Sequence, residues 1–287
     1  MHRLFCLCVA LLAVSGWGVT ASGQDLPEGI QLEKHRVAST GHAVWIYSPK
    51  NAPSGQQLPC VLIAPAGSYL MDGTTVGEGD MPEHLPYVEA GFIVVSYDLT
   101  APLPEDPSDD DIAKCVTAFT ARHGGIEDAR DALKLALEKC PLIDPERLFA
   151  AGHSSAGTLA LMLAQTAPKL RGCIAYAPST DLHSAYGEDL LDSFAELDID
   201  LRGYADRYSP LRHVADLKCP VFLFHATDDD RFETDELQKY SAAAQAAGKD
   251  VERLEVPTGG HYDSMIEPGL SKGIAWLKRR LLALQQP

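Results

Sequence analysis

Short apolar runs alternate with longer amphipathic stretches along most of this chain. The short runs have the length and apolar character of strands that are buried on both faces of a sheet. They occupy residues 60–64, 92–97, 148–151, 173–177 and 221–224, and a further run with alternating polarity lies at 251–256. Ahead of them, residues 33–38 and 42–48 flank a Ser-Thr-Gly turn, which predicts an antiparallel pair. Eight strands are therefore expected.

The stretches between these runs have the periodicity of helices. The clearest is residues 126–139, where Ile126, Ala129 and Leu133 recur on one face. Helices are expected at residues 83–90, 109–122, 126–139, 158–164, 234–247 and 270–284. Because helices alternate with apolar strands, we expect a mostly parallel sheet with helices on both faces.

Residues 181–213 break this alternation, between the sixth and seventh predicted strands. Within them, Leu190, Leu191, Phe194 and Leu197 form an apolar stripe. Such a stripe is typical of core packing, although the wall of a substrate pocket would show the same pattern. We expect the choice of substrate to depend on this insertion.

The first residues of the chain have the pattern of a secretory signal peptide, with a basic start, an apolar core and small residues after it. Cleavage is expected after Ala21 or Gly23, which assigns residues 1–23 to the leader and 24–287 to one catalytic domain. A retained anchor helix is the alternative, but the apolar run is short for a membrane span. The expected location is therefore secreted or periplasmic.

Composition narrows the classes of partner. The chain carries a formal net charge of −16 at pH 7. A surface of this sign repels phosphate backbones and anionic lipids, so we expect no nucleic acid and, after cleavage of the leader, no membrane as a partner. Nothing in the pattern indicates an oligomeric state.

The cysteines and glycines suggest no metal, disulfide or cofactor. The number of cysteines after the leader is odd, and no pair has zinc-finger spacing, so we expect neither a structural metal nor an essential disulfide. Residues 73–79 are rich in glycine but match neither a phosphate loop nor a dinucleotide fingerprint. No cofactor is therefore expected.

The motif Gly-His-Ser-Ser-Ala-Gly at residues 152–157 lies between a predicted strand and a predicted helix. This context is that of a nucleophile elbow, a sharp turn that exposes a serine hydroxyl. In such a turn, the positions two before and two after the nucleophile must be small. Ser154 has glycine and alanine there, whereas Ser155 would place His153 at a crowded position. Ser154 is therefore the candidate nucleophile, and the side chain of His153 is expected to pack away from it.

A serine hydroxyl needs an adjacent base, which is itself oriented by a third group. His261 follows the last predicted strand, and Asp228, Asp229 and Asp230 follow the seventh. Serine, acid and histidine thus come in this order along the chain, each after the carboxyl end of a strand, where open α/β sheets bind their ligands. The pattern predicts a catalytic triad.

These motifs resemble those of the α/β-hydrolase superfamily, and within it the branch of prolyl-oligopeptidase-like and dienelactone-hydrolase-like enzymes. The resemblance covers nearly all of the chain after the leader. It implies the α/β-hydrolase fold, with an eight-stranded, mostly parallel sheet and a short cap inserted after the sixth strand. In that branch the acid lies four residues after a strand-ending histidine, here His225, which implies Asp229 as the acid and leaves Asp228 and Asp230 as flanking competitors.

The same resemblance implies the reaction, a two-step acyl transfer. Ser154 attacks a carbonyl while His261 accepts its proton, and Asp229 orients and stabilises the imidazole. The backbone N–H of Ser155 is an expected donor to the oxyanion, and a second donor is expected from the loop after residues 60–64. Pro65 has no N–H, so the candidates in this loop are Ala66, Gly67, Ser68 and Tyr69.

We expect an exported serine hydrolase that cleaves carboxylic esters through an acyl-enzyme. A small serine peptidase acting on short peptides is the alternative, and a non-catalytic binding protein on a hydrolase scaffold is a further one. The expected partner is accordingly a small-molecule ester or a short peptide. Tyr69 and Arg231 are candidate substrate contacts, although Arg231 would also suit a surface pair with its acidic neighbours.

Overall fold

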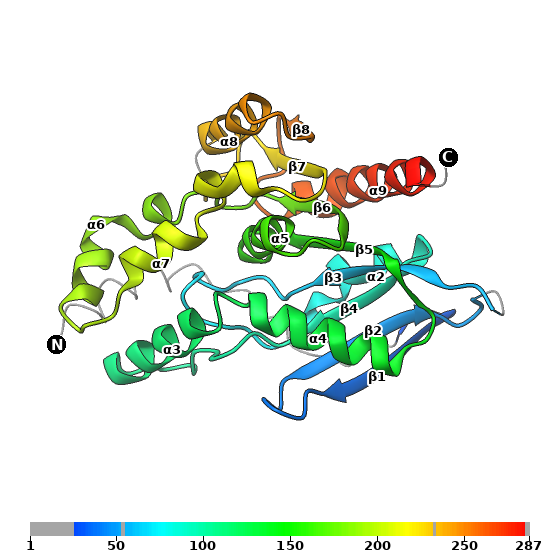
Figure 1. The fold of residues 1–287 in the computed structure, drawn as a ribbon, viewed down its shortest axis with the longest axis horizontal. Helices are drawn as coiled ribbons and strands as arrows, with labels where there is room; N and C mark the ends of the chain where they lie inside the picture. Colours follow the sequence, from blue (N-terminus) through cyan, green and yellow to red (C-terminus); the bar gives the residue numbers. More distant parts are fainter. Residues whose placement is uncertain (1–25, 53–54, 232–233, 285–287) are drawn as a thin grey trace.

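In the part of the chain that the structure describes, one sheet of eight strands organises the fold, in the order β1-β2-β4-β3-β5-β6-β7-β8 (Figure 1). We describe a computed structural model, in which residues 26–52, 55–231 and 234–284 are placed. The leader expected at residues 1–23 lies outside these ranges. The strands are β1 (Ile30–Arg36), β2 (Ala43–Pro49), β3 (Leu58–Ile63), β4 (Ile93–Tyr97), β5 (Ile143–His153), β6 (Leu170–Tyr176), β7 (Val221–Ala226) and β8 (Val251–Val256).

Helices connect these strands. The α-helices are α2 (Met81–Glu89), α3 (Asp109–Ala121), α4 (Ile126–Lys139), α5 (Ser155–Thr166), α6 (Leu182–Ala195), α7 (Leu201–Tyr208), α8 (Thr234–Ala246) and α9 (Leu270–Leu284). Shorter helical turns are η1 (Glu78–Asp80), η2 (Pro210–Asp216) and η3 (Met265–Gly269).

Six neighbouring strands of the sheet, from β4 to β8 in its order, pair with one another in parallel. Strand β1 pairs antiparallel with β2, and β2 pairs antiparallel with β4. From β4 onward every pairing in the sheet is parallel. The carboxyl ends of β3, β5, β7 and β8 therefore lie along one edge, which is where the loops that carry the candidate site residues begin.

Alternate residues of the strands face two different cores, one on each side of the sheet. In β3, Cys60 and Leu62 pack in a cluster with α3, α4, α5 and the insertion helices. Val61 and Ile63 pack in a second cluster with α2 and α9. Because successive side chains of a strand point to opposite faces, an unbroken apolar run is required here. The sequence expectation of an α/β-hydrolase fold with helices on both faces is confirmed.

The insertion between β6 and β7 consists of α6, α7 and η2. Helices α6 and α7 stand together at one end of the sheet, at the left in Figure 1. Leu190, Leu191 and Phe194 are buried in the larger core, whereas Leu197 is 44% exposed. The stripe is therefore core packing, as its pattern favoured, except at Leu197, which lies in the turn after α6 and faces solvent.

Two further features of the placed residues bear on the expectations. Cys60, Cys173 and Cys219 are buried core residues, and all five cysteines of the described ranges are unpaired thiols. Within the same ranges, no helix has both the length and the apolar character needed to cross a membrane.

Candidate active site

Ser154 occupies the turn between β5 and α5. Its backbone lies at φ 54° and ψ −122°, a conformation in which a side chain is strained. The turn is held by the Ser154 N–H, which donates to the carbonyl of Tyr176 on β6 at 2.8 Å. Ser154 is partly exposed whereas Ser155 is buried. Of the two serines, the structure thus presents Ser154 to solvent.

Small residues make this turn possible. A Cβ atom on Gly152 would lie 2.3 Å from the backbone carbon and oxygen of Ala156, far closer than carbon atoms approach. A Cβ on Gly157 would be less crowded, at 3.0 Å from the carbonyl oxygen of Gly152. The steric argument that placed glycine two residues before the nucleophile is therefore supported by the geometry.

The structure brings His261 and Asp229 together across 32 residues of sequence. The Nδ1 of His261 lies 2.8 Å from Oδ2 of Asp229, and the backbone N–H of Arg231 donates to Oδ1 at 2.9 Å. The Asp229 side chain is only 3% exposed. Burial pushes its pKa upward, but the hydrogen bond and charge of His261 and the N–H of Arg231 outweigh this, so the pKa of Asp229 is held below its ordinary value. Asp229 is therefore a carboxylate at neutral pH.

The two competing acids have other environments. Asp228 accepts hydrogen bonds from the N–H groups of Gly260 at 2.8 Å and Gly259 at 3.2 Å, so it holds the loop that carries His261. The side chain of Asp230 is 90% exposed. Of the three neighbouring carboxylates, the hydrogen bond to His261 at 2.8 Å belongs to Asp229.

His153 joins the elbow to the loop that carries His261. Its Nε2 lies 2.8 Å from the carbonyl oxygen of His261, and the centroids of the two rings are 4.6 Å apart. His153 is 4% exposed, so it is packed as expected. The sequence did not indicate its partner, because the two histidines are 108 positions apart and meet only in the folded sheet. Through this contact, His153, which precedes Ser154 in the chain, touches His261, the hydrogen-bond partner of Asp229.

The loop after β3 also reaches the elbow. The N–H of Ser68 donates to Oγ of Ser155 at 3.1 Å, and the N–H of Tyr69 donates to Oδ1 of Asp72 at 2.8 Å. In the described part of the chain, the N–H groups of Ala66 and Gly67 donate to no protein acceptor. Burial raises the pKa of Asp72 to about 7 against the opposing effect of its hydrogen bonds.

The two candidate substrate contacts differ in their surroundings. Tyr69 is partly buried and packs against the larger core. Arg231 has 42% of its side chain exposed, and its Nε lies 3.8 Å from Oδ1 of Asp230. The surface pair that the sequence left open for Arg231 is thus present, and an exposed pair of this kind is weak enough to exchange for a ligand.

Residues 119–282 match the prolyl oligopeptidase family, peptidase family S9. An uncharacterized peptidase, YuxL of Bacillus subtilis (strain 168), is 23% identical over 154 residues, which are 51% of this chain and 23% of that protein. The chain thus spans about a quarter of that relative's length.

Two solved structures illustrate the fold. A puromycin-hydrolyzing peptidase of Mycobacterium tuberculosis superposes with a TM-score of 0.68 at 18% identity, over 91% of this chain and 41% of that one. A putative dienelactone hydrolase of Klebsiella pneumoniae superposes with a TM-score of 0.63 at 17% identity, over 87% of this chain and 99% of that one. At such identity these likenesses establish the fold alone.

The family match covers more than half of the chain and includes the elbow, the acid loop and the histidine loop. It agrees with the resemblance drawn from the sequence motifs and with the α/β-hydrolase topology of the sheet. The chain therefore belongs to the prolyl oligopeptidase family.

Proposed function

We propose that this protein hydrolyses acyl bonds through a covalent intermediate on Ser154, with His261 as the base and Asp229 as the acid that orients it. The observation that carries the proposal is the Asp229–His261 hydrogen bond of 2.8 Å, in a loop that His153 ties to the elbow. The carboxylate accepts from Nδ1–H of the imidazole, which leaves the lone pair on Nε2 to act as the base.

The proton moves in two steps. His261 takes the hydroxyl proton as Oγ of Ser154 attacks the substrate carbonyl, and then gives it to the leaving group as the acyl-enzyme forms. A water molecule then attacks the acyl-enzyme with His261 again transferring the proton, and the acid product leaves Ser154. Asp229 remains ionised throughout and stabilises the imidazolium, which agrees with a carboxyl pKa held below its ordinary value.

The oxyanion of each tetrahedral intermediate needs donors that are fixed beforehand. The N–H of Ser155, in the first turn of α5, has no carbonyl of its own helix to bind. For the second donor we propose the N–H of Ala66 or Gly67, because those of Ser68 and Tyr69 are already engaged. Losing one such donor typically costs about 3–4 kcal/mol of transition-state stabilisation.

The peptide bond is the first candidate for the scissile bond, because the family that matches residues 119–282 is a peptidase family. Carboxylic esters are the second candidate. This chain covers 99% of the putative dienelactone hydrolase but only 41% of the puromycin-hydrolyzing peptidase, so its likeness to the former extends over that whole chain. Arg231 and Tyr69 are the proposed contacts to the substrate.

A fluorophosphonate probe tests the nucleophile. It should label the wild-type protein and Ser155→Ala, which keeps the Ser155 backbone N–H, but not Ser154→Ala. Equal labelling of wild type and Ser154→Ala would refute the assignment. The bond is tested with aminoacyl and prolyl p-nitroanilides beside short-chain p-nitrophenyl esters. Turnover of esters without any turnover of the anilides would overturn the peptidase proposal in favour of an esterase.

Export is proposed from the leader at residues 1–23 alone. Expression in a bacterial host with a periplasm and sequencing of the recovered amino terminus test it. A chain beginning at Ser22 or Gln24 is expected, and a chain that stays in the cytoplasm with Met1 intact would contradict it.

A further inference from the structure

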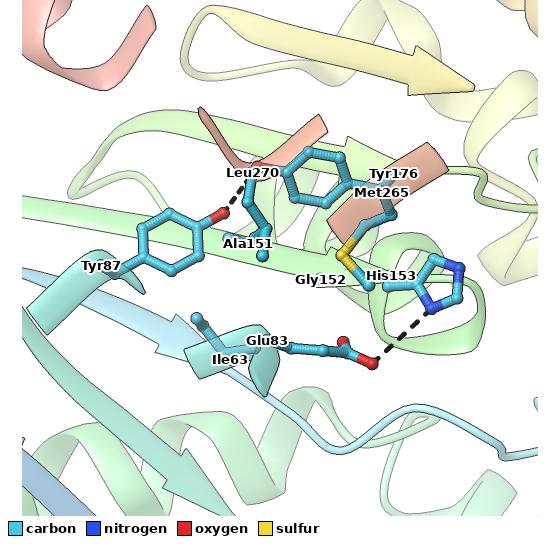
Figure 2. A pocket seen from close by; sticks show the side chains of 9 residues that line it. All are labelled: Ile63, Glu83, Tyr87, Ala151, Gly152, His153, Tyr176, Met265 and Leu270. Carbon is cyan, nitrogen blue, oxygen red and sulfur yellow. Dashed lines mark hydrogen bonds and ion pairs between the residues drawn. The ribbon is translucent and has the colours of Figure 1, made fainter. Parts of the chain in front are cut away.

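A small cavity lies behind the elbow, on the side of the sheet covered by α2 and α9 (Figure 2). Among the side chains that line it are Glu83 and Tyr87 of α2, His153 of β5 and Tyr176 of β6. Figure 2 shows the carboxyl group of Glu83 pointing toward the imidazole of His153, and Oε1 lies 3.9 Å from Nδ1. Neither Glu83 nor the ring of His153 takes part in the proposed proton transfers.

The hydrogen bond of His153 determines where its ring carries a proton. The carbonyl oxygen of His261 can only accept, so Nε2 of His153 must be the donor across their 2.8 Å contact. In a neutral ring, Nδ1 then carries a lone pair. That atom is buried and has no hydrogen-bond partner among the described residues, and the group that faces it is the Glu83 carboxyl.

An ionised carboxylate would point its own lone pairs at this nitrogen. A protonated carboxylic acid would instead donate to it. Burial, reinforced by the charge of Asp80, raises the pKa of Glu83 to about 8. Burial and the charge of His261 lower the pKa of His153 to about 3. At neutral pH the proton shared by the pair therefore resides on Glu83, and the imidazole is neutral.

The separation of 3.9 Å is longer than a hydrogen bond. The cavity has about the room that one water molecule needs. The proton of Glu83 can therefore reach Nδ1 either by a small rotation of the side chain or through one bridging water. Both routes leave Nε2–H of His153 directed at the carbonyl of His261.

We propose that Glu83 and His153 form a second carboxyl–imidazole pair, which positions the loop of His261 from behind by donating to its main-chain carbonyl. This proposal rests on the proposed role of His261 as the base. Asp228 holds the same loop through the N–H groups of Gly259 and Gly260, the two residues that precede His261. His261 is thus held on both its main chain and its ring, and His153 and Glu83 are positioning residues.

The first test is the protonation state of His153 in the wild-type protein. Nitrogen-15 chemical shifts of labelled histidine rings distinguish the two neutral tautomers, and His153→Gln identifies the signal. A neutral ring with the proton on Nε2 is expected between pH 6 and 7.5. A ring with the proton on Nδ1 would overturn the proposal, whatever the variants do.

The second test compares variants that keep or remove the donor. His153→Gln retains an N–H at a similar reach, so kcat should stay within about threefold of wild type. His153→Leu removes the donor, and a displacement of the base by a fraction of an ångström should lower kcat roughly 10- to 100-fold while KM changes less than twofold. Tyr87→Phe is the matched control, because it alters the same cavity, at the Tyr87–Tyr176 hydroxyl contact of 2.8 Å, and should leave kcat within threefold.

Glu83 is tested in the same way. Glu83→Gln places an amide N–H before Nδ1, as the protonated acid would, and should keep kcat within about threefold. Glu83→Leu offers no donor and should lower kcat in the manner of His153→Leu. A folded Glu83→Gln protein with as low a kcat as Glu83→Leu would overturn the assignment of Glu83 as a neutral donor.

A readout that needs no hydrolysis separates this proposal from the proposed function. In Ser154→Ala, the low-field proton signal of the His261–Asp229 hydrogen bond should persist, should weaken when His153→Leu is added, and should return with His153→Gln. An unchanged signal in the double variant with leucine would overturn the positioning role. Hydrolysis that survives Ser154→Ala would instead refute the proposed function.

Discussion

The turn at Ser154 provides a sharp prediction, because one added methyl group at Gly152 must collide with backbone atoms. In Gly152→Ala the new Cβ would lie 2.3 Å from the carbonyl carbon and oxygen of Ala156 and 2.7 Å from the nitrogen of Gly157. Real contacts of this kind exceed 3.0 Å. No side chain can rotate away to relieve them, so the start of α5 must move from β5 by about 1 Å.

The expected losses of stability and of activity in Gly152→Ala follow from that displacement. Overpacking in a well-filled core typically costs about 1–3 kcal/mol, so Gly152→Ala should unfold at a lower urea concentration than wild type. A shift of about 1 Å in a reacting group can lower the rate on the order of 100-fold. Because Ser154 lies in the displaced turn, kcat/KM on an activated ester should fall by this factor or more.

Gly157→Ala is the matched control, since it adds the same methyl group in the same turn. Its Cβ would lie 3.0 Å from the carbonyl oxygen of Gly152 and 3.1 Å from that of Tyr176, so a shift of a few tenths of an ångström suffices. The gain in helix propensity, about 1 kcal/mol, offsets part of that cost. Its kcat/KM should fall less than about tenfold. A Gly152→Ala enzyme that keeps half of its activity, or is more active than Gly157→Ala, would refute the steric reasoning.

Three further predictions concern the carboxyl groups around the site. The folded protein keeps the proton of Glu83 up to about pH 8, whereas an unfolded glutamate releases its proton near pH 4.5. The free energy of unfolding of the wild-type protein should therefore fall as the pH rises through this window, by at most about 1.4 kcal/mol per pH unit. Urea unfolding at pH 5 and pH 8 should accordingly show a growing advantage of Glu83→Gln over wild type, and equal pH slopes would contradict it. Asp229→Asn should lower kcat by about 10⁴-fold, because an amide facing Nδ1 favours the wrong tautomer of His261, and a loss under tenfold would move the acid elsewhere. Asp228→Ala should lower kcat roughly tenfold, because it removes two hydrogen bonds to the loop of His261. Asp230→Ala should leave kcat unchanged, because the side chain of Asp230 is exposed. A larger loss of kcat in Asp230→Ala than in Asp228→Ala would show that Asp230 is the structural residue.

Several elements of the fold could be predicted from the sequence pattern, because their structure depends on residues close together in the chain. Strands β3 and β4 are buried at every position, since both faces of a parallel sheet are covered, and the mostly apolar runs at residues 60–64 and 92–97 reflect this directly. Helix α4 has the expected bounds, because an amphipathic period over 14 residues has few alternatives. The elbow could be recognised from its small residues, whose spacing reflects a collision between neighbouring backbones.

The choice of the catalytic acid and of the oxyanion donors could not be made from the sequence pattern. Three consecutive aspartates follow β7, and nothing in their spacing separates Asp229 from its neighbours. Family resemblance pointed to Asp229, and the structure distinguishes the three by what each oxygen atom meets. Likewise, four residues after Pro65 were candidate oxyanion donors, and only the folded loop shows that the N–H groups of Ser68 and Tyr69 are engaged.

The sequence by itself therefore determined the approximate positions of the eight strands and of the helices between them, but not the helices of residues 181–213, and it identified candidate side chains for the chemistry of a serine hydrolase. Those properties follow from side-chain period, size and acidity, which each segment carries with it. The tertiary structure alone decided the pairings: His153 with the carbonyl of His261, Glu83 with His153, and Asp228 with the glycines of the histidine loop. Hydrogen bonds depend on positions within a few tenths of an ångström, and residues up to 108 apart acquire such positions only when the sheet brings them to one edge.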